Sequence, residues 1–563
     1  MAVLCFLLVP AAAQARDARA NDPDLGPVAL TLPDSAPDVF PTNKQNEPSI
    51  AFNAAEFTAN PSGSAAYHMV AGANDEQEQP KCGPGPRRGA DAPLSDCSFF
   101  PGVGTDGVYT SANGGETWRN EGLIDDAPAW RSANYISDGD PVIVSGPKPA
   151  PGGGFTYANG ARFYYIGLGS EKQSSYNGGK GGAEAIVVSY NDNNGAIANW
   201  SKPVAATRRN PITFNDKNSG WVDRNPSSPH FGKLYVGFTM FRSATLSGNG
   251  NEPIGVTRST DGGNSFGKVN QLSPAGNNGT GNGRQGSDIY TGPDGSVYVA
   301  FEQGSAQVVA ISRDGGVSYS RPITIGPVTD LDDPIPGANF RTDSFPSIAA
   351  DQGPAGTVYA SWTNRTGTAP TSRGVTVLYK STNSGQSWSR KNPAVSTAPG
   401  YAFFDSLDVA PNGRVDVGYQ SLVVPVLSDR STFGTGKAKI DAYVAQSGDG
   451  GSTFTTMKTT PVSSDPAASA QNNLQRQFWG DYNTAVSSND KSWFIYTDSR
   501  TGAGCPAVDA YQQQIAAGGP AVGEEPDDPN AGTDAPGTLT KPAPPTDCPP
   551  NYGDTNAFVG LVP

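Results

Sequence analysis

The sequence predicts an all-β protein, a β-propeller of four-stranded blades, and three observations support this fold. Glycine and proline are abundant, with 69 and 49 of the 563 residues, which is typical of a chain rich in turns. Short runs rich in Val, Tyr, Phe and Trp have the length of strands. One eight-residue motif recurs at intervals of some tens of residues, a spacing typical of arrays and propellers.

The recurring motif combines a serine, an Asp or Asn, glycines and a closing aromatic residue. It suits a hairpin, because the Asp or Asn bonds back to the turn, the glycines adopt positive φ and the aromatic ring packs into the apolar layer. A stretched copy, Ser189–Trp200, accompanies the good ones. The good copies are Ser111–Trp118, Ser259–Phe266, Ser312–Tyr319, Ser381–Trp388 and Ser447–Phe454.

A second pattern, an inner-strand segment followed by a turn and an aromatic-rich strand, recurs between these motifs. Its repetition predicts seven blades, with six as the alternative if one inner strand is misread. The last unit lacks the motif and ends on Asn556–Gly560 as its third strand. We expect Val28–Leu32 to add the fourth strand, because a closed ring hides the free sheet edge.

The N-terminus predicts export, to the cell exterior or the periplasm. Residues 1–20 contain an apolar run, Val3–Val9, followed by Ala11–Ala15, which has the small-x-small form of a signal-peptide cleavage site. The run is too short to span a bilayer, and no later segment is apolar enough to do so. Residues 21–563 are then expected to form a single propeller.

Four cysteines remain after the leader, and neighbours in sequence give the pairs Cys82–Cys97 and Cys505–Cys548. These bridges would brace loop insertions at 75–106 and 500–554, and each should contribute about 3–4 kcal/mol on the chain-entropy account. A zinc site would need tighter Cys-x-x-Cys spacing.

The composition excludes several function classes. A net charge of −14 and a pI near 4.7 argue against nucleic acid as a partner, because such binding depends on Lys and Arg. With His68 and His230 as the only histidines, neither a Ser/His/Asp hydrolase nor a histidine-rich metal site is supported.

The repeated motif resembles the Asp box, or BNR repeat, of sialidases and other Asp-box propellers, and the resemblance covers nearly the whole mature chain. In those proteins the box joins the third and fourth strands of a blade, on the rim away from the active site. The resemblance therefore implies the fold, whereas Asp boxes also occur in propellers without enzymatic activity.

An acidic residue stands at the beginning of every expected inner strand. If these carboxylates converge on the channel mouth, they would form a cation site or a pair for acid/base catalysis. Bound calcium, nearby arginines or protonation would relieve their repulsion, and no other metal or cofactor is expected. The alternative is that each carboxylate caps backbone amides of its own loop. The residues are Glu47, Asp140, Asp216, Asp288, Asp343, Asp405 and Asp481.

Arg284, Arg341 and Arg476 precede inner strands on the same side as the acids. The resemblance implies that three arginines hold a substrate carboxylate, that a tyrosine assisted by a glutamate is the nucleophile, and that an aspartate is the acid/base. Two departures stand out: the Arg-Ile-Pro motif is absent from the first inner strand, Asn46–Ile50, and no glutamate can be placed beside Tyr482. The alternative for Tyr482 is a packed inner-strand aromatic.

These patterns lead to two hypotheses of function. One is a secreted glycoside hydrolase similar to exo-α-sialidases, and the other is a non-catalytic propeller that binds polysaccharide or protein. Both expect a glycan or another extracellular ligand, no nucleic acid, no membrane span and a monomer. The catalytic candidates are Asp481, Tyr482, Glu47 and Asp140; the substrate-binding candidates are Arg284, Arg341, Arg476, Asp216 and Asp405.

Overall fold

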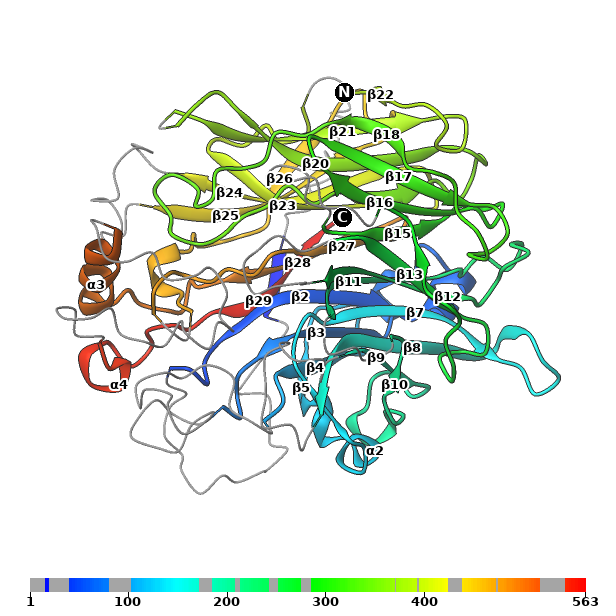
Figure 1. Ribbon diagram of the computed structural model, residues 1–563, viewed down its shortest axis with the longest axis horizontal. Helices are drawn as coiled ribbons and strands as arrows, with labels where there is room; N and C mark the ends of the chain where they lie inside the picture. The colour runs from blue at the N-terminus through cyan, green and yellow to red at the C-terminus, as the bar shows by residue number, and fades with distance from the viewer. Residues whose placement is uncertain are drawn as a thin grey trace, which may run out of the picture.

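The computed structural model contains seven antiparallel sheets, each with a four-stranded blade, arranged as a β-propeller (Figure 1). This confirms the predicted fold and blade count. It describes residues 16–19, 40–79, 103–171, 185–207, 213–242, 252–274, 285–369, 371–391, 394–423, 438–471, 474–516 and 542–563. No helix in these ranges is long and apolar enough to cross a bilayer.

The blades follow the chain, and each runs from an inner strand outward. Blade 1 holds β2 (Gln45–Phe52), β3 (Met69–Asp75), β4 (Asp106–Ser111) and β5 (Arg119–Leu123). Blade 2 holds β7 (Val142–Pro149), β8 (Phe155–Glu171), β9 (Ala185–Asn191) and β10 (Val204–Ala205), and β6 (Tyr135–Ser137) also pairs with β8. Blade 3 holds β11 (Thr213–Val222), β12 (Leu234–Arg242), β13 (Ile254–Ser259) and β14 (Asn270–Gln271).

The later blades repeat the same order. Blade 4 holds β15 (Asp288–Thr291), β16 (Val297–Gln303), β17 (Ala306–Ser312) and β18 (Ile323–Pro327); blade 5 holds β19 (Ser347–Ala350), β20 (Val358–Thr366), β21 (Arg373–Ser381) and β22 (Ser389–Arg390). Blade 6 holds β23 (Tyr401–Val409), β24 (Val415–Val423), β25 (Lys439–Ser447) and β26 (Thr455–Lys458). The helices are α1 (Ala54–Ala59), α2 (Pro128–Arg131), α3 (Pro506–Ala516) and α4 (Pro544–Asp547).

Blade 7 closes the ring with a strand from the N-terminus. It contains β27 (Thr484–Ser487), β28 (Ser492–Asp498), β29 (Asn556–Val562) and, outermost, β1 (Arg16–Arg19). The prediction that Val28–Leu32 supplies this strand is therefore wrong, because Arg16–Arg19 occupies the free edge of β29; Val28–Leu32 itself lies outside the described residues. The expected boundary at residue 20 stays a prediction.

The repeated motif forms the hairpin between the third and fourth strands in six blades. In blade 4 the Ser312 hydroxyl accepts a hydrogen bond from the Gly316 amide at 2.8 Å, and Asp314 Oδ1 accepts from the Ser318 amide at 3.0 Å. Although burial acts in the opposite direction, hydrogen bonds from the Ser318 hydroxyl and then from the Ser318 amide hold the pKa of Asp314 below its usual value. In the stretched copy Asn191 takes the place of the serine and accepts from the Gly195 amide at 3.1 Å.

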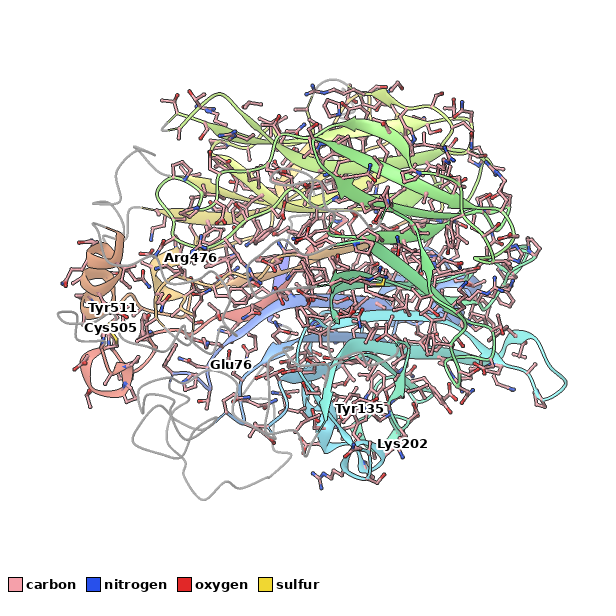
Figure 2. All side chains as sticks on the ribbon, in the orientation of Figure 1. Glu76, Tyr135, Lys202, Arg476, Cys505 and Tyr511 are labelled. Carbon is pink, nitrogen blue, oxygen red and sulfur yellow. A yellow bond between two sulfur atoms is a disulfide. The ribbon has the colours of Figure 1, made fainter. Side chains whose placement is uncertain are left out.

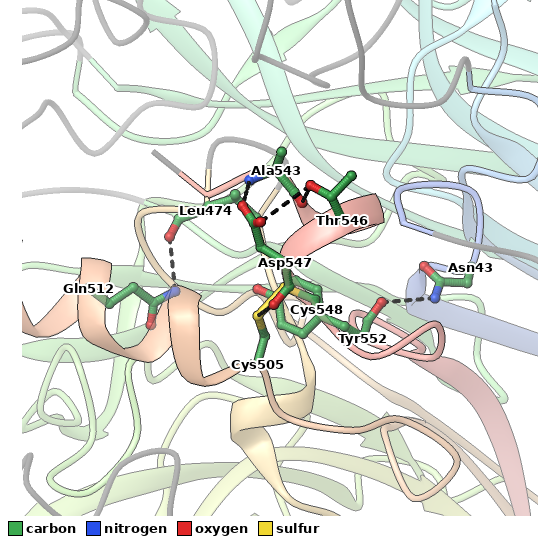
Figure 3. Close-up of a disulfide and its surroundings, with 9 residues drawn as sticks. All are labelled: Asn43, Leu474, Cys505, Gln512, Ala543, Thr546, Asp547, Cys548 and Tyr552. Carbon is green, nitrogen blue, oxygen red and sulfur yellow. Dashed lines mark hydrogen bonds between the residues drawn. A yellow bond between two sulfur atoms is a disulfide. The ribbon is translucent and has the colours of Figure 1, made fainter. Parts of the chain in front are cut away.

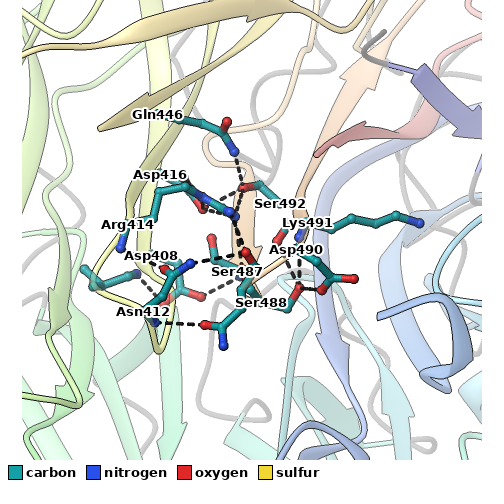
Figure 4. Close-up of polar contacts among 12 residues, drawn as sticks. Asp408, Asn412, Arg414, Asp416, Gln446, Ser487, Ser488, Asp490, Lys491 and Ser492 are labelled. Atoms are coloured by element: carbon teal, nitrogen blue, oxygen red, sulfur yellow. Dashed lines mark hydrogen bonds and ion pairs between the residues drawn. The ribbon is translucent and has the colours of Figure 1, made fainter. Parts of the chain in front are cut away.

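Side chains of one inner strand bind backbone amides of the next blade. Ser49 Oγ accepts from the Ile143 amide at 2.9 Å, and Ser347 Oγ accepts from the Leu407 amide at 3.0 Å. Blades 6 and 7 are also joined at the turns between their first and second strands, where Arg414 Nη2 donates to the Ser488 carbonyl and to Ser492 Oγ, both at 3.0 Å (Figure 4). Such bonds fix the rotation of each blade against its neighbour.

The insertion at 500–554, in blade 7, is closed by a disulfide and packs against the ring. Cys505 and Cys548 form a disulfide with a Cα–Cα distance of 5.0 Å, as predicted (Figure 3). Both cysteines belong to an apolar cluster with Phe40 and Leu474, and α3 is tied to the ring because Gln512 Nε2 donates to the Leu474 carbonyl at 3.0 Å. Cys82 and Cys97 lie outside the described residues.

Replacing both Cys505 and Cys548 by serine should lower the free energy of unfolding by about 2–4 kcal/mol, because the bridge closes a long loop. Chemical denaturation of parent and variant measures this change, and the parent treated with reductant is a second comparison. An unchanged unfolding midpoint would show that the apolar cluster, rather than the bridge, holds the insertion.

Candidate functional site

A channel cavity of about 190 Å³ lies among the inner strands, and residues from all seven blades line it. Its polar lining gathers at the beginning of these strands, where sequence analysis placed the acidic residues. Ser49, Lys217, Asp343, Phe404 and Asp481 represent five of the contributing blades.

Asp481 is the centre of a buried ion network. Arg341 grips its carboxylate with both arms of the guanidinium, Nε to Oδ1 at 2.7 Å and Nη2 to Oδ2 at 2.6 Å, and Lys217 Nζ donates to the same Oδ2. Burial opposes the charge of Asp481, but Arg341 and then Lys217 outweigh it and hold the pKa of this carboxyl below its usual value. Asp481 is therefore ionised at neutral pH.

A bulge in the inner strand aims Lys217 at the channel. The register of β11 shifts between Asp216 and Ser219, and Lys217 adopts a left-handed backbone with φ of 51°. The same bulge occurs in β2, where Glu47 has φ of 52°. Bulges and left-handed non-glycine residues cost free energy and recur at functional sites, where they redirect side chains.

Glu47 and Asp140 form a second, poorly neutralised part of the site. Asn74 joins them, because its Nδ2 donates to Glu47 Oε2 at 2.7 Å and its Oδ1 accepts from the Asp140 amide at 3.0 Å. Glu47 Oε1 and Asp140 Oδ2 are buried and accept no hydrogen bond from a described N–H or hydroxyl donor, and the Glu47 and Asp140 carboxyls are in hydrogen-bond contact with each other. Unpartnered carboxylate oxygens favour the protonated form of the group.

The pKa values follow from this imbalance. Burial raises the pKa of Glu47, and the negative charge of Asp481 raises it further. Burial likewise raises the pKa of Asp140 and of Asp216 to about 7, although Lys217 acts in the opposite direction on both. Four carboxyl groups, those of Glu47, Asp140, Asp216 and Asp481, thus share two cations, Lys217 and Arg341. The raised pKa values favour retained protons, which relieve the excess of negative charge.

Glu47 and Asp481 are held close by a glycine. Gly480 has φ of 84°, and a Cβ atom there would lie 2.7 Å from Glu47 Cγ. Only glycine combines this backbone conformation with so close an approach. The segment Trp479–Asp481 therefore brings the ionised carboxylate of Asp481 beside Glu47, whose pKa is raised.

Tyr482 also lies in this group. Its hydroxyl donates to the Pro141 carbonyl at 3.5 Å, and no described carboxylate accepts a hydrogen bond from it. Burial raises the pKa of the phenol well above its usual value, and the charges of Asp140 and Glu47 add to this effect. The tyrosine is therefore a neutral phenol in the protein as it stands.

The described arginines do not form a shared cluster. Arg341 binds Asp481, whereas Arg476 pairs with Asp333 at 2.6 Å; Figure 2 labels Arg476 on the side of the ring that carries Cys505. Arg284 lies outside the described residues. Of the expected three arginines, the structure places one at the channel mouth.

Two of the repeated acids serve the scaffold. Asp405 accepts from Ser361 Oγ and Thr363 Oγ1, both at 2.7 Å, and burial raises its pKa to about 6. Asp288 Oδ2 accepts from the Ile348 amide of the next blade at 2.8 Å. For Asp288 the structure supports the capping alternative, because its Oδ1 also accepts from the Ile289 amide of its own blade at 2.8 Å.

Sequence reasoning missed Lys217 and Asn74. Lys217 directly follows a repeated acid, and a lysine beside an expected cluster of carboxylates was the available signal. Asn74 lies at the end of the second strand and is brought to Glu47 only by the register of β2 and β3.

Comparison with known proteins finds similar solved structures and no matching family. No family model and no curated protein matches the sequence. Similar solved structures include a protein of unknown function from Dyadobacter fermentans (16% identity, TM-score 0.33, covering 52% of this chain and 77% of that one). A Hadza microbial sialidase (13%, 0.39, covering 67% and 63%) and a leech intramolecular trans-sialidase (14%, 0.37, covering 67% and 65%) are also similar.

This chain therefore spans less than two thirds of the length of these two sialidase structures. At these identities the likeness concerns the fold alone. The seven-bladed architecture is established by the strand pairing of the chain itself.

Asp140→Asn and Asp216→Asn should flatten the pH dependence of stability. Both carboxyls have a raised pKa in the folded protein, so their favourable contribution is complete below about pH 4 and is lost as pH rises through about 7. Each variant should exceed the parent by about 1–3 kcal/mol at pH 8. Denaturation between pH 4 and 8 measures the slope, and Asp192→Asn, a carboxylate whose side chain is 42% exposed, is the control. A parent without this slope would contradict the assignment.

Arg341→Met should destabilise the protein by about 2 kcal/mol, because it leaves the buried Asp481 with Lys217 as its remaining cation. Arg476→Met is the matched variant: its partner Asp333 has a side chain that is 35% exposed, so the loss should stay below about 1 kcal/mol. Thermal or chemical unfolding compares the two. Equal losses would mean that the Asp481 network adds no more than a surface ion pair.

Proposed function

We propose that this protein is an exported glycan-acting propeller that hydrolyses glycosidic bonds at the channel mouth. The observation that carries the proposal is the pairing of an ionised carboxylate, Asp481, with the proton-holding carboxyls of Glu47 and Asp140. Glycoside hydrolysis commonly uses two carboxyl groups whose environments drive their pKa values apart.

The roles follow from the protonation states. Glu47, supported by Asp140, would donate a proton to the oxygen of the leaving group. Asp481 would face the sugar ring and stabilise the positive charge that develops there as the bond breaks. Arg341, with a side chain that is 30% exposed, would orient the carboxylate and contact an anionic substituent of the sugar.

A non-catalytic binding function is the second candidate, and one observation favours it. Both oxygens of Asp481 already accept bonds from Arg341, and Lys217 adds another, so this carboxylate is restrained as a nucleophile. A site of fixed charges suits recognition of a charged sugar as well as catalysis.

Release of sugar from a panel of aryl glycosides, including sialosides and uronides, tests the hydrolase. Glu47→Gln and Asp140→Asn should lower kcat by about 10²–10⁴-fold, the usual loss for a missing proton donor. Activity should fall as pH rises above about 7, because Asp140, with a pKa of about 7, then loses its proton.

The control is Asp288→Asn, an inner-strand acid bonded to the next blade, provided that its unfolding midpoint shows an intact fold. No turnover on the panel, with glycan binding that depends on Arg341, would replace the hydrolase by the binding function. Neither turnover nor glycan binding would refute both candidates.

A further inference from the structure

A separate group of three carboxylates lies at the rim of the channel. Glu302 stands near the end of β16, Asp330 follows β18, and Asp343 precedes β19. One oxygen from each of the three lies within 4.8 Å of the others. The group differs from the Asp481 network in that no lysine or arginine of the described residues forms an ion pair with its members within 4.0 Å. The charges of Asp481 and Lys217 nevertheless act on Asp343, and that of Arg365 acts on Asp330.

The Glu302 carboxyl is the buried member of this group. Its Oε2 atom is buried and accepts no hydrogen bond from a described N–H or hydroxyl donor, while the carboxyl itself is in hydrogen-bond contact with that of Asp330 inside the group. The negative charges of Asp343 and Asp330 act directly on this carboxyl. An inward-facing acid among other acids is costly unless a proton or a cation neutralises it.

The group is held in place before any ligand arrives. The loop that carries Asp330 is fixed on both sides, because the Thr329 carbonyl accepts from the Arg365 amide at 2.8 Å and the Leu331 amide donates to Ser344 Oγ at 3.2 Å. Asp343 Oδ1 accepts from the Ser344 amide at 2.7 Å, and this bond orients the carboxylate. Preorganised ligands lower the entropic cost of binding.

We propose that Glu302, Asp330 and Asp343 bind a calcium ion. The ligand set is all oxygen, without His or Cys, which suits a hard cation rather than zinc. Asp330 is exposed, so solvent has access and water molecules can complete the six to eight ligands that calcium takes at about 2.3–2.6 Å. Magnesium demands a stricter octahedron and gives up its water reluctantly.

The ion would also connect with the channel. Asp343 lines the same cavity as Asp481, and the charge of Asp481 acts on it. A bound cation would thus cancel negative charge at one edge of the proposed glycan site. The calcium proposal does not depend on hydrolysis, since it concerns these three carboxylates alone.

Calcium titration of the EDTA-treated full chain, followed by calorimetry and thermal unfolding, tests the site. We expect a dissociation constant of about 0.1–1 mM and an unfolding midpoint that rises with calcium. Glu302→Gln and Asp330→Asn should each weaken binding at least about tenfold, since each removes a charged ligand. In EDTA, Glu302→Gln should unfold at a higher temperature than the parent, because a buried acid is gone.

Asp509→Asn is the matched control: it removes a partly buried carboxyl on α3 whose pKa is raised to about 7 by burial, and it should keep the parent's calcium affinity. Absence of binding to the parent at about 10 mM calcium would overturn the proposal. So would variants that retain the parent's affinity, which would place the ion elsewhere, or tighter binding of magnesium than of calcium. Asp330→Asn changes an exposed loop residue, so its result stands even if Glu302→Gln fails to fold.

Discussion

The unpaired edge of each inner strand is the constraint on which the ring depends. Such a strand has a sheet partner on one side only, and its other edge faces the narrow channel, where buried amides need acceptors. Side chains of the preceding blade supply them: Ser49 serves Ile143, Asp288 serves Ile348, and Ser406 serves Ala485. Because these acceptors must point around the ring, their bonds set both the blade rotation and the width of the channel.

The same strands must also turn charged side chains toward the channel mouth, and bulges make this compatible with the ladder. In β2 and β11 the extra residue adopts a left-handed backbone, which places Lys217 in the channel lining and Glu47 against Gly480, while Ser49 and Ser219 stay in the ladder. The backbone strain of these two left-handed residues therefore occurs at the candidate site. The hairpins of the repeated motif lie between outer strands and contribute regular hydrogen bonds without charged contacts to the site.

The fold could be predicted from sequence because each blade repeats the same local chemistry. Serine, Asp or Asn, glycine and an aromatic residue encode one hairpin, and the hairpin fixes the third and fourth strands. The closing strand could not be predicted in this way, since Val28–Leu32 and Arg16–Arg19 both lie on the N-terminal segment and short strands carry little signal. Position in the repeat likewise located the acids but not their partners. Asp405 and Asp481 occupy similar places, yet two hydroxyls bind one and two cations bind the other.

What separates those acids is the charge on neighbouring blades, which no repeat encodes. Lys217 comes from blade 3 and Arg341 from the segment before blade 5, and both reach across the channel to Asp481 before blade 7. Both cations bond Asp481, and although Lys217 also acts on Asp140 and Asp216, burial prevails there and raises the pKa of these two carboxyls to about 7. The proton-holding acids are thus a consequence of where the two cations lie. If either cation moved toward an anionic ligand, the Asp481 carboxylate would lose that counter-ion. The proton affinity of the whole cluster of carboxyls would then rise.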